Sequence, residues 1–147
     1  MLSLLFYFSF FVLPLAAVAY ICVIFIGYIV GMSEYVRLNN RKERHIEIKH
    51  VYAAFQEELH ELQEAIHNKD LVGIFLEAFD CIHSYIKYIF TKWLPISLEM
   101  NPIVWIPVFF IVLPVSVKHG YRYLNHGCIR NHGNKNNLGH ICNYRDE

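Results

Sequence analysis

The chain has 147 residues, of which 13 are basic and 13 are acidic, and 55% of its residues are hydrophobic. This length allows one domain of modest size. A formal net charge of zero excludes a protein whose whole surface is basic, so we expect no nucleic acid among its partners.

The first 33 residues contain no Asp, Glu, Lys, Arg or His, and Glu34 is the first charged residue. A helix of about 20 apolar residues crosses a bilayer, so residues 1–33 are predicted to form a transmembrane anchor. A cleaved signal peptide is the alternative, because Ala17-Val18-Ala19 resembles a small-residue cleavage site. The absence of a basic segment before the apolar run, and its continuation through Val30, favour an uncleaved anchor.

Basic residues follow this apolar run, and none precedes it: Arg37, Arg41, Lys42, Arg44 and Lys49. The positive-inside rule then predicts a single-pass membrane protein whose C-terminal part lies in the cytosol. Residues 34–50 are polar and mixed in charge, and we expect them to form a juxtamembrane linker or helix.

Two amphipathic helices are predicted next, joined by the polar turn Asn68-Lys69-Asp70. The first runs from about Val51 to His67, with an apolar stripe of Val51, Phe55, Leu59, Leu62 and Ile66. The second runs from about Leu71 to Thr91, and its inward residues are expected to be Phe75, Phe79, Ile82, Ile86 and Ile89. Asp70 is a candidate N-cap and Pro95 a stop signal. Histidines of these helices are expected at boundary or solvent-facing positions: His60, His67 and His83.

A second apolar run covers residues 102–117. As a helix these sixteen residues would reach about 24 Å, short of the bilayer core, and Pro107 and Pro114 interrupt them. We therefore favour a buried or oligomer-facing helix over a membrane-inserted segment. Residues 51–124 are predicted to form one helical domain, and residues 125–147 a polar tail rich in His, Asn and Gly.

Acidic residues are concentrated on the two amphipathic helices. Residues 57–80 contain seven acidic residues, and Lys69 is the only lysine or arginine among them. Residues three apart on a helix lie about one turn apart on neighbouring azimuths, so each of two pairs can converge on one ion: Glu58 with Glu61, and Glu77 with Asp80. If the helices pack antiparallel, four carboxylates meet across one groove. One or two Mg²⁺ ions would relieve their repulsion. An ordinary solvated acidic helix face is the alternative.

These residues resemble a known family. Glu57-Glu58-x-x-Glu61, fifteen intervening residues and Glu77-x-x-Asp80 are similar to the signature of the all-α nucleoside triphosphate pyrophosphohydrolases, in particular MazG-like proteins. The resemblance covers about Val51–Ile89, including Glu-Leu-His-Glu-Leu-Gln-Glu-Ala-Ile. It implies an all-α helical bundle of that type, here preceded by one N-terminal transmembrane helix.

The resemblance also implies hydrolysis of a nucleoside triphosphate to the monophosphate and pyrophosphate, with Mg²⁺ or Mn²⁺ as cofactor, in a homo-oligomer. Carried over by position, the metal ligands would be Glu58, Glu61, Glu77 and Asp80. Glu57 would orient the attacking water or bind a second ion, and Glu61 would share in catalysis. The physical logic agrees, since a metal-bound water loses its proton readily to a nearby carboxylate.

The segment after the second helix is basic, with no acid in residues 100–144. Candidate phosphate-binding residues are Lys118, Arg122 and Arg130, with attraction to anionic lipid as the alternative. Two His-x-Cys pairs could supply four Zn²⁺ ligands: His126, Cys128, His140 and Cys142. That spacing differs from the usual zinc motifs, so we interpret them as tail residues with reduced thiols.

Three functions are therefore compared. The leading one is a membrane-anchored, Mg²⁺-dependent nucleotide pyrophosphohydrolase. The second is a catalytically inactive membrane adaptor or assembly protein that uses the helical bundle. The third is a binding module stabilised by zinc in the tail.

Overall fold

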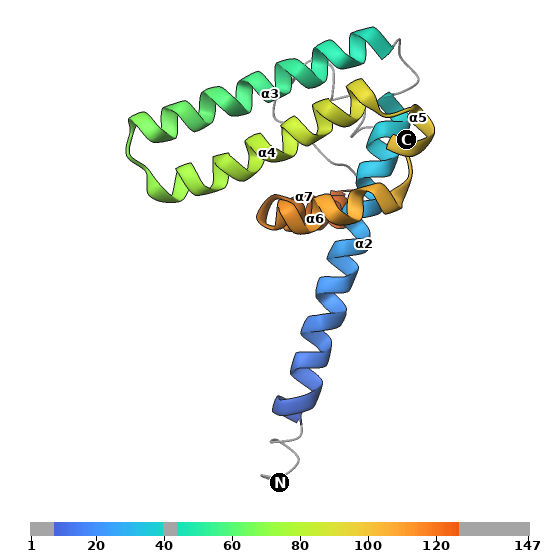
Figure 1. Cartoon of the computed structure of the whole chain (residues 1–147). Helices are drawn as coiled ribbons and strands as arrows, with labels where there is room; N and C mark the ends of the chain where they lie inside the picture. The colour runs from blue at the N-terminus through green and yellow to red at the C-terminus, as the bar shows by residue number, and fades with distance from the viewer. Residues whose placement is uncertain (1–7, 40–43, 127–147) are drawn as a thin grey trace.

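The computed structural model describes residues 8–39 and 44–126, and every element within them is helical. The elements are η1 (Phe8–Val12), α2 (Leu13–Asn39), α3 (Arg44–His67), α4 (Leu71–Trp93), α5 (Ile96–Glu99), η2 (Pro102–Val104), α6 (Trp105–Ile111) and α7 (Leu113–His126). The all-α prediction is confirmed at this level. Figure 1 shows α3 and α4 side by side, α6 and α7 next to α4, and one half of α2 extending away from the rest.

The long helix α2 does not end where the predicted anchor ends. It continues past residue 33 to Asn39, so the boundary between anchor and linker falls inside one continuous helix of 27 residues. Pro14 lies just after the π-helical turn η1, so the helix is irregular at the proline and regular after it. By length and composition, residues Ser9–Arg37 form a helix that can cross a membrane, and 11% of its most apolar stretch is buried. A core helix of a soluble protein would be mostly buried.

The helices α3 and α4 form an antiparallel hairpin over the predicted ranges, with α3 starting earlier, at Arg44. Asp70 is the N-cap of α4, since its Oδ1 accepts a hydrogen bond of 3.0 Å from the Gly73 N–H. Lys69 takes a left-handed φ of 53° in the turn. The helix α4 ends at Trp93, two residues before Pro95, as predicted.

The second apolar run is divided rather than forming one helix. Pro107 lies in the first turn of α6 and Pro114 in the first turn of α7, the positions where proline costs least. Between the two helices, Val112 leaves the helical conformation with φ −118° and ψ 44°. The run is buried in part, as expected, because Trp105 and Phe109 are buried while Phe110 is exposed.

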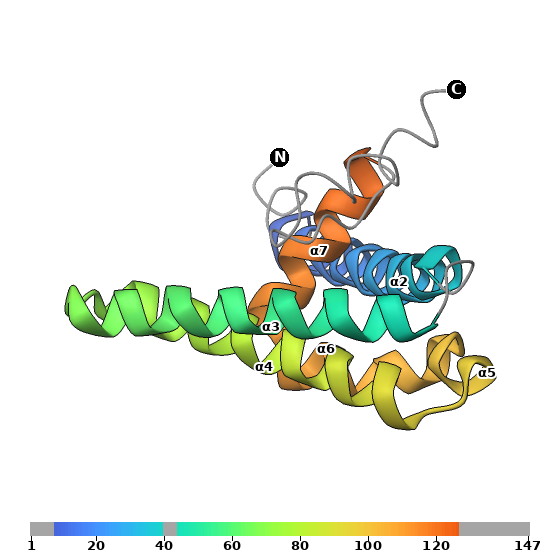
Figure 2. The same cartoon turned by 90° about the horizontal axis from the view of Figure 1, so that it is seen from above.

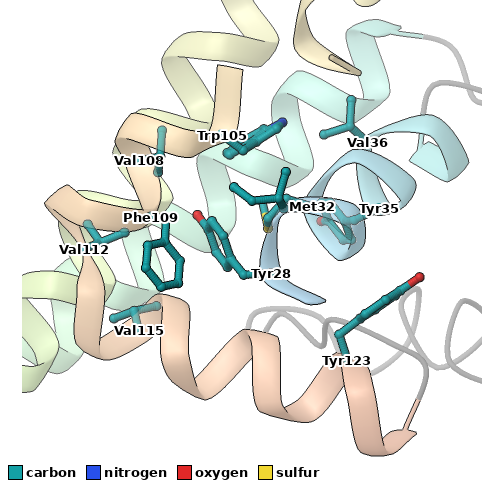
Figure 3. Close-up of a cluster of buried hydrophobic side chains, with 11 residues drawn as sticks. Tyr28, Met32, Tyr35, Val36, Trp105, Val108, Phe109, Val112, Val115 and Tyr123 are labelled. Carbon is teal, nitrogen blue, oxygen red and sulfur yellow. The ribbon is translucent and has the colours of Figure 1, made fainter. Parts of the chain in front are cut away.

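The apolar core is built by α2, α6 and α7, not by the α3–α4 hairpin (Figure 3). It contains Tyr28, Ile29, Met32, Tyr35, Val36, Trp105, Val108, Phe109, Val112, Val115 and Tyr123. Phe25 stands edge-on to Phe109, with their ring centroids 4.7 Å apart. The upper half of α2 is therefore an integral part of the folded domain.

The orientation predicted for α4 is wrong in its main feature. The buried residues of this helix are all polar: His83, Ser84, Lys87 and Thr91. Phe75 and Ile82, expected inward, are 57% and 43% exposed, although Phe79 and Ile86 do pack against the core. On α3, Val51 is buried as predicted but Ile66 is 54% exposed. The polar face of α4 points inward because buried groups of opposite charge from other elements neutralise it, as described below.

The helices α2 and α7 cross at two glycines, and Figure 2 shows this crossing from above. A Cβ on Gly120 would stand 2.4 Å from the Ile24 carbonyl oxygen, and a Cβ on Gly27 would stand 3.1 Å from the Gly120 carbonyl oxygen. Both contacts involve backbone atoms, which cannot move aside as a flexible side chain would. Glycine is required here by the closeness of the two backbones.

We expect Gly120→Ala to lower the thermal melting temperature of the detergent-solubilised chain, because the added Cβ must push α7 away from α2. Overpacking of this kind costs about 1–3 kcal/mol. Asn125→Ala, an exposed position on the same helix, is the matched control and should melt like the wild type. Equal melting temperatures for Gly120→Ala and the wild type would contradict the close crossing.

Candidate metal site

The hairpin brings acidic residues from both helices to one place. Glu58 of α3 and Glu77 and Asp80 of α4 each offer a carboxylate oxygen, and these oxygens all lie within 4.8 Å of one another. Glu58 is buried, while Glu77 and Asp80 are half-buried. Tyr52 against Tyr88 and Phe55 against Tyr85, each with ring centroids 5.3 Å apart, hold the antiparallel pairing that places Glu58 opposite Asp80.

The fourth predicted ligand, Glu61, lies one turn from Glu58 on α3, and its charge acts on Glu77 of α4. Burial, followed by the charges of Asp80 and Glu61, raises the pKa of Glu77. We call Glu58, Glu61, Glu77 and Asp80 the carboxylate cluster. Glu57 is half-buried on α3 and does not belong to the group of converging oxygens.

Glu58 is the most perturbed acid of the carboxylate cluster. Its pKa is raised from 4.5 to about 7, first by burial and then by the negative charges of Asp80, Glu61 and Glu77. Lys87 opposes this shift only in part. At neutral pH Glu58 is therefore close to half-protonated, and a cation at the cluster would favour its ionised form.

Two lysines lie close to the carboxylate cluster. Lys118 of α7, a predicted phosphate-binding residue, places its Nζ 3.7 Å from Asp80 Oδ2 and is 42% exposed. Lys87 is buried, with its Nζ 4.3 Å from the centroid of the Tyr35 ring. Burial lowers the pKa of Lys87 to about 8, although Glu58 and Glu99 act in the opposite direction. The carboxylate cluster has four carboxyl groups, and Lys87 and Lys118 supply two amines beside it, so carboxyl groups outnumber amines by two.

Lys87 lies on the face of α4 that its spacing from Asp80 and Ser84 predicts, although no site role was predicted for it. Asp80, Ser84, Lys87 and Thr91 recur every three or four residues, so they line one face of α4. That face continues to Glu99, whose Oε1 accepts a 2.7 Å hydrogen bond from Thr91 Oγ1. The charge along this face alternates from acidic to basic to acidic, which limits the cost of burying it.

His83 is a residue that sequence analysis misjudged, because it is buried rather than exposed at a helix boundary. Its Nε2 lies 3.1 Å from the Tyr28 hydroxyl of α2, and its ring stacks on that of His119 with centroids 5.1 Å apart. Burial, and then the neighbouring His119 and Lys87, hold its pKa well below its ordinary value. A neutral His83 joins α4 to α2 and α7 beside the carboxylate cluster.

The other predicted site residues are not joined to the carboxylate cluster. Arg122 follows Lys118 by one turn on α7, and its Nη1 is buried without a hydrogen-bond partner. Arg130 lies outside the described residues. The same holds for Cys128, His140 and Cys142 of the candidate zinc site, and the side chain of His126 is not described.

The carboxylate cluster could hold a hard divalent cation, because three of its carboxylate oxygens lie within 4.8 Å of one another. Mg²⁺ and Mn²⁺ prefer oxygen ligands, and Mg²⁺ usually keeps several waters when one or two carboxylates hold it. Glu58, Glu77 and Asp80 supply such oxygens from two adjacent helices. The excess of acids, expressed in the raised pKa of Glu58 and Glu77, is relieved by a positive ion.

This electrostatic strain predicts a pH dependence of stability in the absence of divalent metal. Glu58 ionises near 4.5 when unfolded and near 7 when folded, so its ionisation penalises the folded state increasingly as pH rises from about 4.5 to about 7. We expect Glu58→Gln to gain stability relative to the wild type over this window. Thermal melts at several pH values measure the difference.

The exposed Glu64→Gln on the same helix should show no such gain. Millimolar Mg²⁺ should stabilise the wild type above pH 7 and leave Glu58→Gln nearly unchanged. A difference between Glu58→Gln and the wild type that is constant from pH 4.5 to 8 would show that Glu58 carries no electrostatic strain.

Comparisons of the chain with protein-family models, with curated proteins and with solved structures find no match. The likeness to the MazG-like enzymes therefore rests on the motif residues alone. The carboxylate cluster, with Lys118 at its edge and Lys87 buried behind it, is the feature on which a function can be argued.

Proposed function

We propose that this protein is a membrane-anchored, Mg²⁺-dependent nucleotide pyrophosphohydrolase that converts a (d)NTP to the (d)NMP and pyrophosphate. The single observation that supports it best is the convergence of three carboxylate oxygens from α3 and α4 within 4.8 Å. The acids that converge are those of the motif shared with the MazG-like enzymes. A triphosphate needs both a divalent cation and a positive side chain, and the site offers a place for each.

In this proposal the metal ligands are Glu58, Glu77 and Asp80, with Glu61 completing the set. When bound, Mg²⁺ would screen the triphosphate charge and lower the pKa of a coordinated water. Glu61 is the candidate to accept a proton from that water, because it lies one turn from Glu58 and close enough to Glu77 for its charge to act on it. Glu57, outside the converging group, is left with an orienting role at most.

Lys118 is the phosphate-binding residue that the geometry favours. It is exposed enough to move, and its partner Asp80 would be drawn to the metal. Once released from Asp80, the Lys118 amine would lie next to the metal. It could then bind the phosphate oxygens that the metal coordinates. Lys87, buried and closer to neutral, would instead adjust the charge of Glu58 from behind.

The membrane anchor in this proposal is α2, which is long and apolar enough to cross a bilayer. The basic residues that follow the apolar stretch place the hairpin on the cytosolic side by the positive-inside rule. Cytosolic nucleotides would then reach the carboxylate cluster directly. The chain would be a single-pass membrane protein.

An assembly role without catalysis is the second candidate, and the outer face of α4 favours it. Leu71, Phe75, Ile82 and Trp93 share a helical face opposite the carboxylates and are 81%, 57%, 43% and 71% exposed. We call these four residues the outer stripe of α4. An exposed apolar stripe of this size is typical of a protein–protein contact. It also offers a surface for the homo-oligomer that the resemblance implies.

Turnover by the full chain in nanodiscs, assayed with each (d)NTP, tests the enzymatic proposal. Asp80→Asn and Glu61→Gln should lower pyrophosphate release by at least about 100-fold, because each removes a negative group at the metal. Glu64→Gln is the control and should keep wild-type activity. Circular dichroism checks that the helices of each variant remain.

Full activity in both variants would refute the assignment of the metal site. If the wild type hydrolyses no (d)NTP, calorimetric titration with Mg²⁺ and a non-hydrolysable triphosphate separates the two candidates. Formation of a ternary complex excludes a purely structural role, and its absence favours the assembly protein.

We expect Phe75→Glu and Ile82→Glu to shift the detergent-solubilised chain to a smaller oligomer, because each places a charge in the outer stripe of α4. Light scattering coupled to size-exclusion chromatography measures the mass. Gln63→Glu, an exposed polar position on α3, is the control. A mass unchanged by both α4 variants would show that this stripe does not join copies of the chain.

A further inference from the structure

The helix α7 carries a second apolar stripe that the proposed catalysis does not use. Leu113, Val117, Tyr121 and Leu124 follow one another at spacings of four, four and three residues, so they share one face. They are 45%, 38%, 51% and 44% exposed. Phe110 and Ile111 at the end of α6 extend this surface, at 66% and 54% exposure. We call these six residues the α6–α7 surface.

The α6–α7 surface lies at the level where the uncovered part of α2 begins. In Figure 1, α6 and α7 are on the side of the α3–α4 hairpin toward which the free part of α2 extends. The contact between α7 and α2 is the glycine crossing, where Gly120 meets Ile24 and Tyr28. Any membrane that reaches this level of α2 must therefore reach α7 as well.

The apolar surface of α2 continues through this level. Ile26 and Val30 are 57% and 43% exposed, and they stand on the same turns of α2 as the crossing residues Ile24 and Tyr28. The first charged residue of the chain, Glu34, comes one turn after Val30. The exposed apolar residues of α2 thus reach the level of its crossing with α7 before the first charged residue of the chain.

The charges of α7 fit a helix at a membrane surface. Between Leu113 and Asn125 the helix contains no acid, and Lys118 is 42% exposed, whereas the Nη1 of Arg122 is buried. A helix with an apolar face bordered by basic residues is typical of one lying in the lipid interface. Tyr121 has the amphipathic ring common at that depth.

We propose that the α6–α7 surface rests in the hydrocarbon edge of the leaflet that α2 crosses, so that lipid acyl chains cover it. This inference rests on the proposed membrane span by α2. The protein then contacts the membrane twice, through a span and through a helix lying along the interface. Because Lys118 belongs to the same helix, the second contact holds the carboxylate cluster at a fixed height close to the lipid headgroups.

Spin-label accessibility in vesicles tests the proposal on the full chain. With the four native cysteines replaced by serine, nitroxide labels are placed one at a time at Leu113, Tyr121, Val18 of α2 and Gln63 of α3. Collisions with O₂, which partitions into lipid, are compared with collisions with a water-soluble nickel chelate, in vesicles of phosphatidylcholine and phosphatidylglycerol.

We expect the ratio of O₂ to nickel collisions to be several-fold higher at Leu113 and Tyr121 than at Gln63, and comparable to that at Val18. A lipid-like ratio at Val18 with water-like ratios at Leu113 and Tyr121 overturns the proposal and leaves the anchor intact. A water-like ratio at Val18 overturns the anchor and this proposal together. Dipolar broadening between the Tyr121 labels of two molecules, together with few collisions with either O₂ or nickel, overturns the proposal. That result would show that a second copy of the chain covers this surface.

A second measurement uses the wild-type chain, in case the cysteine-free variant does not fold. Lipids with a photoreactive group on the acyl chain are incorporated into the same vesicles, and mass spectrometry locates the cross-links. We expect adducts on Phe110–Leu124 as well as on α2. Adducts on α2 without any on Phe110–Leu124 overturn the proposal.

Discussion

The structure depends on the neutralisation of the polar face of α4, which is buried between the other helices. Lys87 is buried between Glu58 at one end of this face and Glu99 near the other, and both acids favour its charged form, although its Nζ has no hydrogen-bond partner. Hydrogen bonds from Thr91 to the Glu99 side chain, and from Trp105 Nε1 to the Glu99 carbonyl oxygen at 2.9 Å, hold the far end in place. Buried charges are tolerated only when they are compensated in this way. The compensation is incomplete at the carboxylate cluster, where carboxyl groups outnumber amines. A metal cation bound there would neutralise the remaining negative charge.

Turning the polar face inward has a consequence for the rest of the molecule. The buried residues of the apolar core come from α2, α6 and α7, and α4 adds the partly buried Phe79, Ile86 and Phe90 at its edge. A helix that is apolar enough to cross a membrane therefore also provides half of the core of the domain. In the proposed arrangement the catalytic hairpin is not a soluble enzyme on a flexible tether. It is fixed to the anchor through Tyr28, which meets His83, and through the glycine crossing with α7.

Sequence periodicity predicted the hairpin well and its orientation poorly. The ends of α3 and α4, the Asp70 cap and the stop before Pro95 follow from local rules that act within one turn of helix. The same periodicity shows that α4 has an apolar and a polar face, but it does not say which face is inward. Phe75 and Ile82 were expected in the core because apolar groups usually avoid water. In this fold the face that carries His83, Ser84, Lys87 and Thr91 is buried instead, and periodicity alone does not distinguish the two orientations.

The sequence by itself determined the helices, the turn and the spacing of the acids, because backbone hydrogen bonding and capping depend on neighbouring residues. It also determined that Glu58 and Glu61 lie one turn apart, as do Glu77 and Asp80. Only the tertiary structure decided that Glu58, Glu77 and Asp80 converge while Glu57 lies outside the group, and that Lys118 and Lys87 are the cations beside them. Contacts of this kind join helices far apart in the chain, and their distances are set by how those helices pack. The raised pKa of Glu58 likewise depends on burial and on neighbouring charges, which exist only once the helices have come together.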